Sequence, residues 1–346
     1  RERNRVCLHI PWFAVSAITI KPLLWNVLLN QERLSPKPVV RHFVLLNKKQ
    51  HQRLCKQCRM TKDNYRSGYV AVIGRPNVGK STLVNALVGE KVSIVTSKPQ
   101  TTQINILGIV HLPHTQIMLV DTPGLLSGRG KRLSSKQTRK ETRNALAMAD
   151  LAVVVVEVNR WKKEDDYLME RLGEFNFEKI LAVNKIDLFK DKSQILDFLA
   201  QSSTKGSFKE IVPISALRGK NITRLRSLME ANLPFQTPQF SKTTVTDQST
   251  VFRISEIVRE KLMKCLRDEL PYSLTCEVDH MEEKNNLILI ELSILLFKES
   301  HKKIVIGKNG RTLKQVGTES RREIEKLLGK KVFLSSVVKT SQKRRI

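Results

Sequence analysis

Short apolar runs alternate with helix-like patterns through the middle of the chain. Strands are expected at 69–73, 104–110, 116–120, 151–158, 180–183 and 210–214, and helices at 82–87 and near Arg143, Met169, Leu196 and Leu225. Such alternation is typical of a mostly parallel sheet with helices on both faces. We therefore predict an α/β domain over residues 67–232.

A different pattern follows. Residues 233–251 contain two prolines and several Ser and Thr with little apolar periodicity, which predicts a linker. Apolar residues then recur at helical spacing from Ile254 to Leu266, and strand-like runs follow at 273–278 and 287–296. These elements predict a smaller α+β domain over 252–346 that ends in a basic tail.

An octapeptide between the first expected strand and helix fits G-x-x-x-x-G-K-[ST], the phosphate-binding P-loop. Its glycines let backbone N–H groups point at phosphate oxygens, and the following helix offers its positive end. Lys80 is suited to neutralise the β- and γ-phosphates, and Ser81 to bind Mg²⁺. The predicted nucleotide-binding residues here are Gly74, Arg75, Pro76, Asn77, Val78, Gly79, Lys80 and Ser81.

Three further motifs follow in the order that a GTP-binding protein needs. Asp121-Thr122-Pro123-Gly124 closes a strand, where the aspartate would hold Mg²⁺ through water and Gly124 would offer an N–H to the γ-phosphate. Asn184-Lys185-Ile186-Asp187 selects guanine, because one carboxylate accepts from the ring N–H and the 2-amino group together. Ile214-Ser215-Ala216 would place backbone N–H groups of Ser215 and Ala216 at the guanine oxygen. We predict that GTP and GDP bind here with Mg²⁺.

With these motifs, Lys98-Pro99-Gln100-Thr101-Thr102 resembles the Era family of GTPases, and the similarity runs from about residue 68 to about 334. The resemblance implies an α/β P-loop GTPase domain in which Q-T-T is switch I. One threonine then reaches Mg²⁺ and the γ-phosphate; we expect Thr102, with Thr101 as the competing choice. The expected metal ligands are thus Ser81, Thr102 and Asp121, and the expected catalytic residues Lys80, Thr102 and Gly124.

The residue after Gly124 bears on the rate of hydrolysis. Many GTPases place a glutamine close behind this motif to orient the attacking water, whereas this chain has Leu125-Leu126. We expect slow intrinsic hydrolysis that a partner completes.

The second domain contains Ile304-Val305-Ile306-Gly307-Lys308-Asn309-Gly310. In KH domains a G-x-x-G turn joins two short helices and clamps the backbone of about four nucleotides. With its flanking residues this segment resembles the type II KH domain of Era proteins. The predicted RNA-binding residues are Ile306, Gly307, Lys308, Asn309, Gly310 and Lys314.

The resemblance implies a protein that binds the 3′ end of small-subunit ribosomal RNA and acts in assembly of that subunit, with peripheral contact to the inner membrane in bacteria. Two alternatives stay open. One is an assembly-type GTPase that acts through protein partners without specific RNA binding. The other is an RNA-binding module whose nucleotide pocket regulates without turnover.

Composition adds a strong positive charge. The 346 residues contain 61 Lys and Arg against 33 Asp and Glu, a formal net charge of +28 that predicts attraction to nucleic acid or to an anionic membrane surface. Residues 128–143 are rich in Lys and Arg, as a partner-contacting surface or a solvated loop would be. We expect a monomer.

Two segments depart from the family pattern. Residues 235–250 lack the usual acidic, proline-led opening. After Leu334 the chain lacks the usual alternating strand near a tryptophan, so we expect the last KH strand to be shortened or frayed.

Residues 1–66 form a basic leader with an apolar stretch, Val6 to Ile20, that is too short to span a bilayer. Export would separate a GTPase from GTP, which excludes a signal peptide. A mitochondrial transit peptide would place the protein in the matrix; a start at Met60, which we favour, fits the cytoplasm. The five cysteines favour a reducing compartment, and Cys55-Lys56-Gln57-Cys58 is only a partial zinc pattern.

Overall fold

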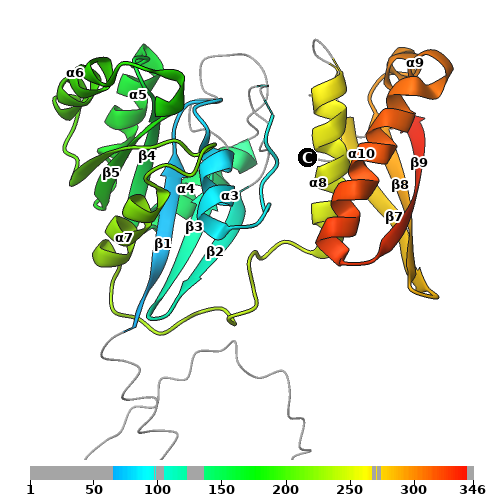
Figure 1. Cartoon of the computed structure of the whole chain (residues 1–346), viewed down its shortest axis with the longest axis horizontal. Coiled ribbons are helices and arrows are strands. Elements are labelled where there is room, and N and C mark those ends of the chain that lie inside the picture. The colour runs from blue at the N-terminus through cyan, green and yellow to red at the C-terminus, as the bar shows by residue number, and fades with distance from the viewer. Residues whose placement is uncertain are drawn as a thin grey trace, which may run out of the picture. The chain divides into compact units, whose positions relative to one another are not determined.

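The computed structural model describes residues 65–96, 98, 105–122, 136–266, 270 and 274–340, with backbone alone for 136–141 (Figure 1). In chain order the elements are β1 (Arg66–Ile73), α3 (Lys80–Val88), β2 (Ile106–Leu112), β3 (Thr115–Asp121), α4 (Lys136–Ala147), β4 (Leu151–Glu157), α5 (Lys163–Leu172), β5 (Glu178–Asn184), the 3₁₀ turn η1 (Ile186–Leu188), α6 (Lys192–Ser203), β6 (Glu210–Pro213), α7 (Ile222–Asn232), α8 (Thr250–Cys265), β7 (Leu274–Lys284), β8 (Leu287–Leu296), α9 (Ser300–Ile306), the 3₁₀ turn η3 (Lys308–Gly310), α10 (Arg311–Leu328) and β9 (Lys331–Thr340).

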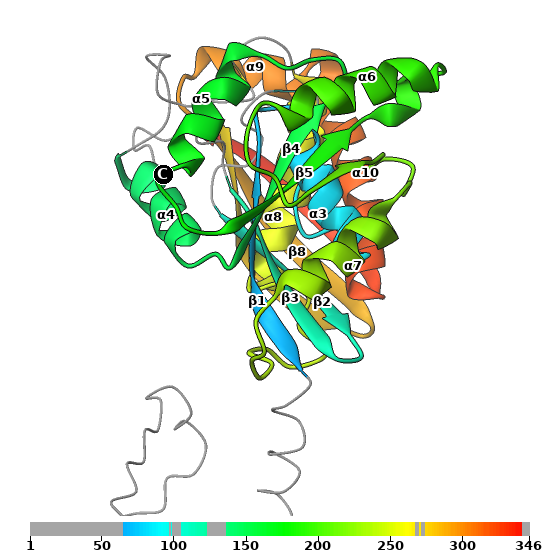
Figure 2. The same ribbon diagram turned by 90° about the vertical axis from the view of Figure 1, so that its left-hand side faces the viewer.

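The first part of the described chain is a six-stranded sheet in the order β2-β3-β1-β4-β5-β6 (Figure 2). Only the pair β2 and β3 is antiparallel, and the other neighbours run parallel. The predicted mostly parallel α/β sheet is confirmed. In such a sheet the carboxyl ends of the strands form one edge, where ligands bind.

Strand β1 shows why both faces of this sheet are covered. Val70 and Val72 pack in the core beneath α3 and α7, whereas Ala71 and Ile73 point to the opposite face and pack with residues of α4, α5 and α6. Side chains alternate along a strand, so a continuous apolar run supplies two cores. The buried strands give the loops at the sheet edge a rigid support.

The segment expected as a linker lies along the sheet. The side-chain amide of Gln116 accepts from the N–H groups of Gln239 and Phe240 and donates to the carbonyl of Phe240. Ile109 also donates its N–H to the carbonyl of Val245. These contacts fix a segment that has little apolar pattern of its own.

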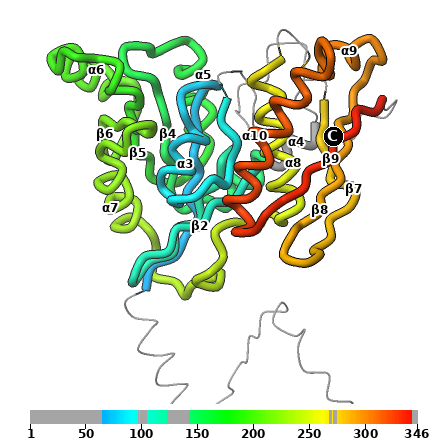
Figure 3. Tube along the Cα trace, turned by 45° about the vertical axis from the view of Figure 1, so that its right-hand side comes forward, coloured from blue at the N-terminus to red at the C-terminus, as the bar shows by residue number. Residues whose placement is uncertain are grey.

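The second part has the order α8-β7-β8-α9-α10-β9. Its three-stranded sheet pairs β7 with β8 antiparallel and β8 with β9 parallel. Asn285 and Asn286 form the β7–β8 turn with positive φ angles of 47° and 66°, which suits a two-residue hairpin loop. The helices α8 and α10 cover one face of this sheet (Figure 3), and their apolar residues share its core. This arrangement confirms a small α+β domain.

Two expectations about these strands were wrong. Strand β9 is neither short nor frayed: it pairs with β8 over ten residues, from Leu287 opposite Lys331 to Leu296 opposite Thr340. Backbone pairing, together with the buried Val332 and Val338, holds the strand without a tryptophan. Strand β7 also extends beyond Val278 to Lys284, although that half carries mostly polar residues.

None of the described helices combines the length and apolar character that a crossing of the bilayer requires.

The start of α8 provides a test of local stability. The hydroxyl of Ser249 accepts a hydrogen bond from the N–H of Phe252 at 3.2 Å and so caps the helix. We expect Ser249→Ala to lower the free energy of unfolding by about 1 kcal/mol. Ser249→Asp should keep most of the stability that the cap provides, because aspartate also accepts this hydrogen bond. Urea denaturation measures both; an unchanged midpoint for the alanine variant would show that the cap contributes nothing.

Candidate nucleotide and nucleic-acid sites

The P-loop curls between β1 and α3 with two glycines that close contacts require. A Cβ at Gly74 would lie 2.4 Å from the carbonyl oxygen of Val155 on β4. A Cβ at Gly79 would lie 2.3 Å from Nδ2 of Asn184, and Gly79 also has a left-handed φ of 102°. Any other residue at either position would push the loop away from its neighbours.

Lys80 lies at the centre of this loop. Its Nζ is 3.0 Å from the carbonyl oxygens of both Gly74 and Arg75. Burial lowers the pKa of the Lys80 ammonium, a cost that the nearby Asp121 carboxylate partly offsets. Phosphate oxygens would give this buried cation stronger partners than two carbonyls.

Oxygen atoms suited to Mg²⁺ lie beside the P-loop. The hydroxyl of Ser81 donates to Oδ2 of Asp121 at 2.7 Å, and the hydroxyl of Ser93 donates to the same oxygen at 2.8 Å. Within the described ranges there is no group of three or more His, Cys, Asp or Glu placed to hold a metal. This donor set fits Mg²⁺, which is commonly held by one or two protein oxygens, substrate phosphates and water.

The motif predicted to select guanine is hydrogen-bonded directly to the P-loop. The Asn184 amide donates to the carbonyl of Val78 at 2.8 Å and accepts from the N–H of Ala216 at 2.9 Å. Asp187 remains exposed in the turn after β5, and one of its oxygens accepts from the Ser215 hydroxyl. The structure thus brings together the residues predicted at both ends of a nucleotide.

The two amides predicted to meet the guanine oxygen already have partners. The N–H of Ser215 donates to the carbonyl of Lys220, and that of Ala216 to Asn184. A guanine oxygen would have to share or replace these bonds.

The Thr122 hydroxyl donates to the carbonyl of Val72 and so anchors β1.

Several predicted site residues lie outside the described residues. They are Thr101 and Thr102 of switch I, and Pro123, Gly124 and Leu125 after the buried Asp121. Their roles stay predictions.

The side chain of Arg75 makes hydrogen bonds outside the P-loop that the sequence motif does not predict. Its guanidinium donates to Oδ2 of Asp165 at the start of α5 and to the carbonyl of Arg160, both at 2.6 Å. Burial raises the pKa of the Asp165 carboxyl, although the hydrogen bond from the N–H of Lys162 and the positive charge of Arg75 both act to lower it. The side chain of Arg75 therefore points to the β4–α5 turn. Only its backbone N–H would then be available to a bound phosphate.

The same turn reaches the guanine motif through Glu157, the last residue of β4. Its carboxylate lies 3.4 Å from Nζ of Lys185 and 3.3 Å from Arg160. Sequence analysis missed Glu157, Arg160 and Asp165 as residues near the site. The one signal, for Glu157 alone, was a carboxylate that ends an otherwise apolar strand.

The predicted G-x-x-G turn lies between α9 and α10 in the second part. Gly307 and Gly310 both have positive φ, at 77° and 71°. A Cβ at Gly307 would lie 2.3 Å from Oγ1 of Thr312, so this position is closed to larger residues. Lys308 and Asn309 are exposed at the tip. At Gly310, by contrast, an added Cβ would meet no heavy atom within 4 Å, so the turn is open on that side.

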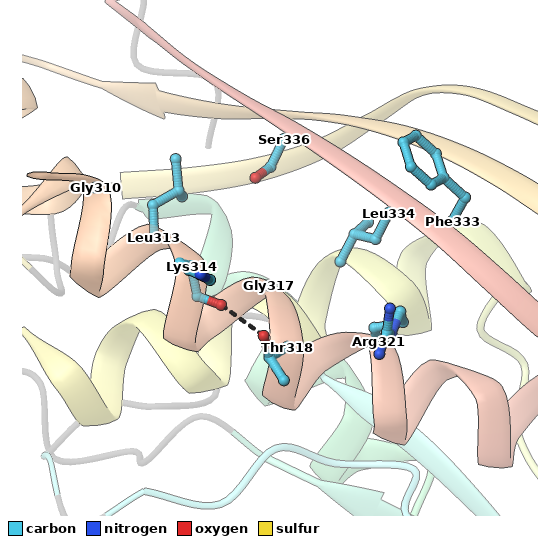
Figure 4. Close-up of a pocket in the computed structure, with 9 residues that line it drawn as sticks. All are labelled: Gly310, Leu313, Lys314, Gly317, Thr318, Arg321, Phe333, Leu334 and Ser336. Atoms are coloured by element: carbon cyan, nitrogen blue, oxygen red, sulfur yellow. Dashed lines mark hydrogen bonds between the residues drawn. The ribbon is translucent and has the colours of Figure 1, made fainter.

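A groove of about 410 Å³ begins at this turn and runs between α10 and β9 (Figure 4). It is lined by Gly310, Leu313, Lys314, Gly317, Thr318 and Arg321 of the helix side and by Phe333, Leu334 and Ser336 of the strand. Gly310 and Lys314 were predicted; Ile306 instead packs against the core. Helical spacing could have indicated the other helix residues, because residues that follow Gly310 by three, four, seven, eight and eleven positions lie on the same face of the helix.

Comparison with known proteins gives two family matches. Residues 69–185 match the model described as a 50S ribosome-binding GTPase, and residues 269–345 match the KH domain. Curated relatives include GTPase Era of Xanthomonas oryzae pv. oryzae (strain MAFF 311018), 43% identical over 82% of this chain and 94% of the relative. GTPase Era of Xylella fastidiosa (strain M12) is 44% identical over 80% and 92%.

Two solved structures are similar over most of the chain. One is Era in complex with MgGDPNP and nucleotides 1506–1542 of 16S ribosomal RNA, with a TM-score of 0.75 and 33% identity over 80% of this chain and 94% of that one. The other is a variant of Aquifex aeolicus Era bound to GDP and AlF4⁻, with a TM-score of 0.74, 33% identity and the same coverage.

The contact between Glu157 and Lys185 gives a prediction for the nucleotide site. Glu157→Gln should raise the dissociation rate of a fluorescent GDP analogue by about two- to fivefold, the scale of a partly exposed ion pair. In a Lys185→Ala background the same change should have little further effect, because the carboxylate then has no ammonium to position.

The matched control is Glu178→Gln at the opposite end of β5, where the carboxylate pairs with Lys209 at 3.6 Å. It should leave the dissociation rate unchanged. Stopped-flow fluorescence measures all four variants, and effects of Glu157→Gln that simply add to those of Lys185→Ala would contradict positioning through the lysine.

Proposed function

This chain belongs to the Era family of GTPases, and we propose that it binds GTP with Mg²⁺ at the P-loop and hydrolyses it slowly. We propose further that it binds the 3′ end of small-subunit ribosomal RNA in the groove between α10 and β9. The nucleotide state then controls RNA binding during assembly of the small ribosomal subunit.

The nucleotide part rests above all on Asn184, whose two hydrogen bonds connect the guanine motif to the P-loop and to Ala216. In the proposed site Lys80 binds the β- and γ-phosphates, and Asp187 accepts from guanine. Ser81 and Thr102 bind Mg²⁺, with Asp121 acting through water. The crystallised relative that holds MgGDPNP supports this assignment.

Hydrolysis needs a positioned water and stabilisation of charge on the γ-phosphate. Lys80, Mg²⁺ and the N–H of Gly124 supply the second requirement in this proposal. Leu125 has no group that could orient water, which supports a low intrinsic rate. The family's complex with GDP and AlF4⁻ agrees with phosphoryl transfer at such a site.

The RNA part rests on the groove that continues from the G-x-x-G turn. Gly307 and Gly310 admit the phosphate backbone, and Lys308, Lys314 and Arg321 offer positive charge beside it. Apolar side chains of Leu313 and Phe333 offer surfaces to bases. The relative crystallised with a 16S ribosomal RNA fragment supports RNA over a protein partner as the occupant.

Domain limits and location follow the same reasoning. We assign 67–232 to the GTPase domain, 233–251 to the connection and 252–346 to the KH domain. We place the protein where small subunits assemble, in the cytoplasm with peripheral membrane contact, or in the mitochondrial matrix if residues 1–66 target it there.

The two activities should separate by mutation, because their residues lie in different sheets and helices. Lys80→Ala should weaken GTP binding by at least about thirtyfold, the cost of removing one partner of a buried charge pair, and spare RNA binding. Lys308→Asp should weaken RNA binding by about tenfold, the scale of one or two phosphate contacts, and spare GTP.

Lys284→Asp is the matched control: it makes the same charge change at the β7–β8 hairpin, where Lys284 pairs with Glu282 at 2.8 Å. Isothermal titration with GTP analogue and with labelled RNA measures each variant. Loss of both activities in either variant, with circular dichroism unchanged, would refute this division.

A further inference from the structure

We infer that Gly317 is a specificity-determining residue of the RNA groove, where the bare backbone of α10 admits one base of single-stranded RNA into van der Waals contact. The inference rests on the proposed function, in which this groove binds RNA.

Neither helix geometry nor turn geometry explains this glycine. Gly317 lies inside the 18-residue helix α10, where glycine is less favourable than any residue except proline. It is not among the described glycines with positive φ, so its backbone conformation is open to any residue. A glycine at this position lowers helix stability without local compensation.

Packing does not explain it either. A Cβ added to Gly317 meets no heavy atom within 4 Å. At Gly108, by contrast, an added Cβ would lie 2.8 Å from Cγ2 of Val88, so that glycine is required by its neighbour. The space over Gly317 therefore belongs to the groove and not to the protein core (Figure 4).

The surroundings of this space suit a nucleotide. Leu313 lies one turn before Gly317, and Leu334 points from β9 toward the helix, which gives an apolar cleft for the face or edge of a base. Phe333 lines the groove farther along β9, near Arg321, where its ring is 59% exposed. Lys314 and Arg321 line the same groove and favour the adjacent phosphates. Their positive charge favours an RNA strand over an apolar peptide.

The Thr318 side chain also supports contact between a base and this part of α10. Its hydroxyl donates to the carbonyl of Lys314 at 2.9 Å, so its oxygen is turned along the helix and remains able to accept. A base that lies against Gly317 would meet this oxygen and the exposed backbone next to it. A methyl group at Gly317 would occupy the position of that base.

The test is Gly317→Ala, because the inference requires opposite effects on stability and on binding. The midpoint of thermal unfolding should rise by about 4 °C, since alanine is the better helix residue and no clash opposes it. Affinity for an RNA with the 3′-terminal sequence of small-subunit ribosomal RNA should fall by about tenfold. An otherwise identical RNA with abasic positions should bind both proteins equally, because the methyl group opposes a base.

The matched control is Gln315→Ala, an exposed position on the same helix that does not line the groove. It should leave RNA affinity unchanged. Unchanged RNA binding by Gly317→Ala, or a lower unfolding midpoint, would overturn the inference, since the glycine would then be neutral or structural. Absence of RNA binding by the wild-type protein would instead overturn the proposed function, and this inference with it.

Discussion

The nucleotide site depends on the side-chain amide of Asn184. It donates to the P-loop at Val78 and accepts from the N–H of Ala216, so one residue at the end of β5 joins loops that follow β1 and β6. Gly79 leaves no room for a side chain beside it, because a Cβ would lie 2.3 Å from the amide. This contact sets the spacing between the loop proposed to receive phosphates and the residues proposed to receive guanine.

The rest of the site holds buried charges whose cost polar neighbours partly offset. Lys80 is buried and its pKa is lowered, yet two carbonyls and the nearby Asp121 keep it paired. Arg75 and Glu157 extend the support outward through the β4–α5 turn. A rigid sheet edge with paired charges is pre-organised, so less binding energy is needed to order it around GTP.

The two sites use glycine for related reasons. In the P-loop, Gly74 makes room for the carbonyl of Val155 and Gly79 for the side-chain amide of Asn184. In the KH domain, Gly307 of the G-x-x-G turn meets the same kind of constraint against Thr312, whereas Gly317 in the groove leaves space that the protein itself does not fill. The first kind of glycine is explained by the fold, and the second is explained only by a ligand.

The sequence predicted the sheet and the order of the GTP motifs because each depends on local spacing: apolar runs of strand length and short motifs at their carboxyl ends. It did not predict the ion pair of Arg75 with Asp165 or that of Glu157 with Lys185, since each joins segments far apart in the chain. The length of β9 was also missed, because its pairing with β8 compensates for a weak pattern. The groove residues on α10 follow helical spacing, but the β9 residues Phe333 and Ser336 could be identified only from the fold.

The measurement that tests this account most directly is fluorescence anisotropy of a labelled single-stranded RNA carrying the 3′ end of small-subunit ribosomal RNA. The full chain would be titrated with a non-hydrolysable GTP analogue or with GDP, at two salt concentrations. The account predicts tight binding that depends on the bound nucleotide and discriminates against an RNA of scrambled sequence. Weak binding that ignores both nucleotide and sequence and only falls with salt would contradict it, because positive charge alone would then hold the RNA.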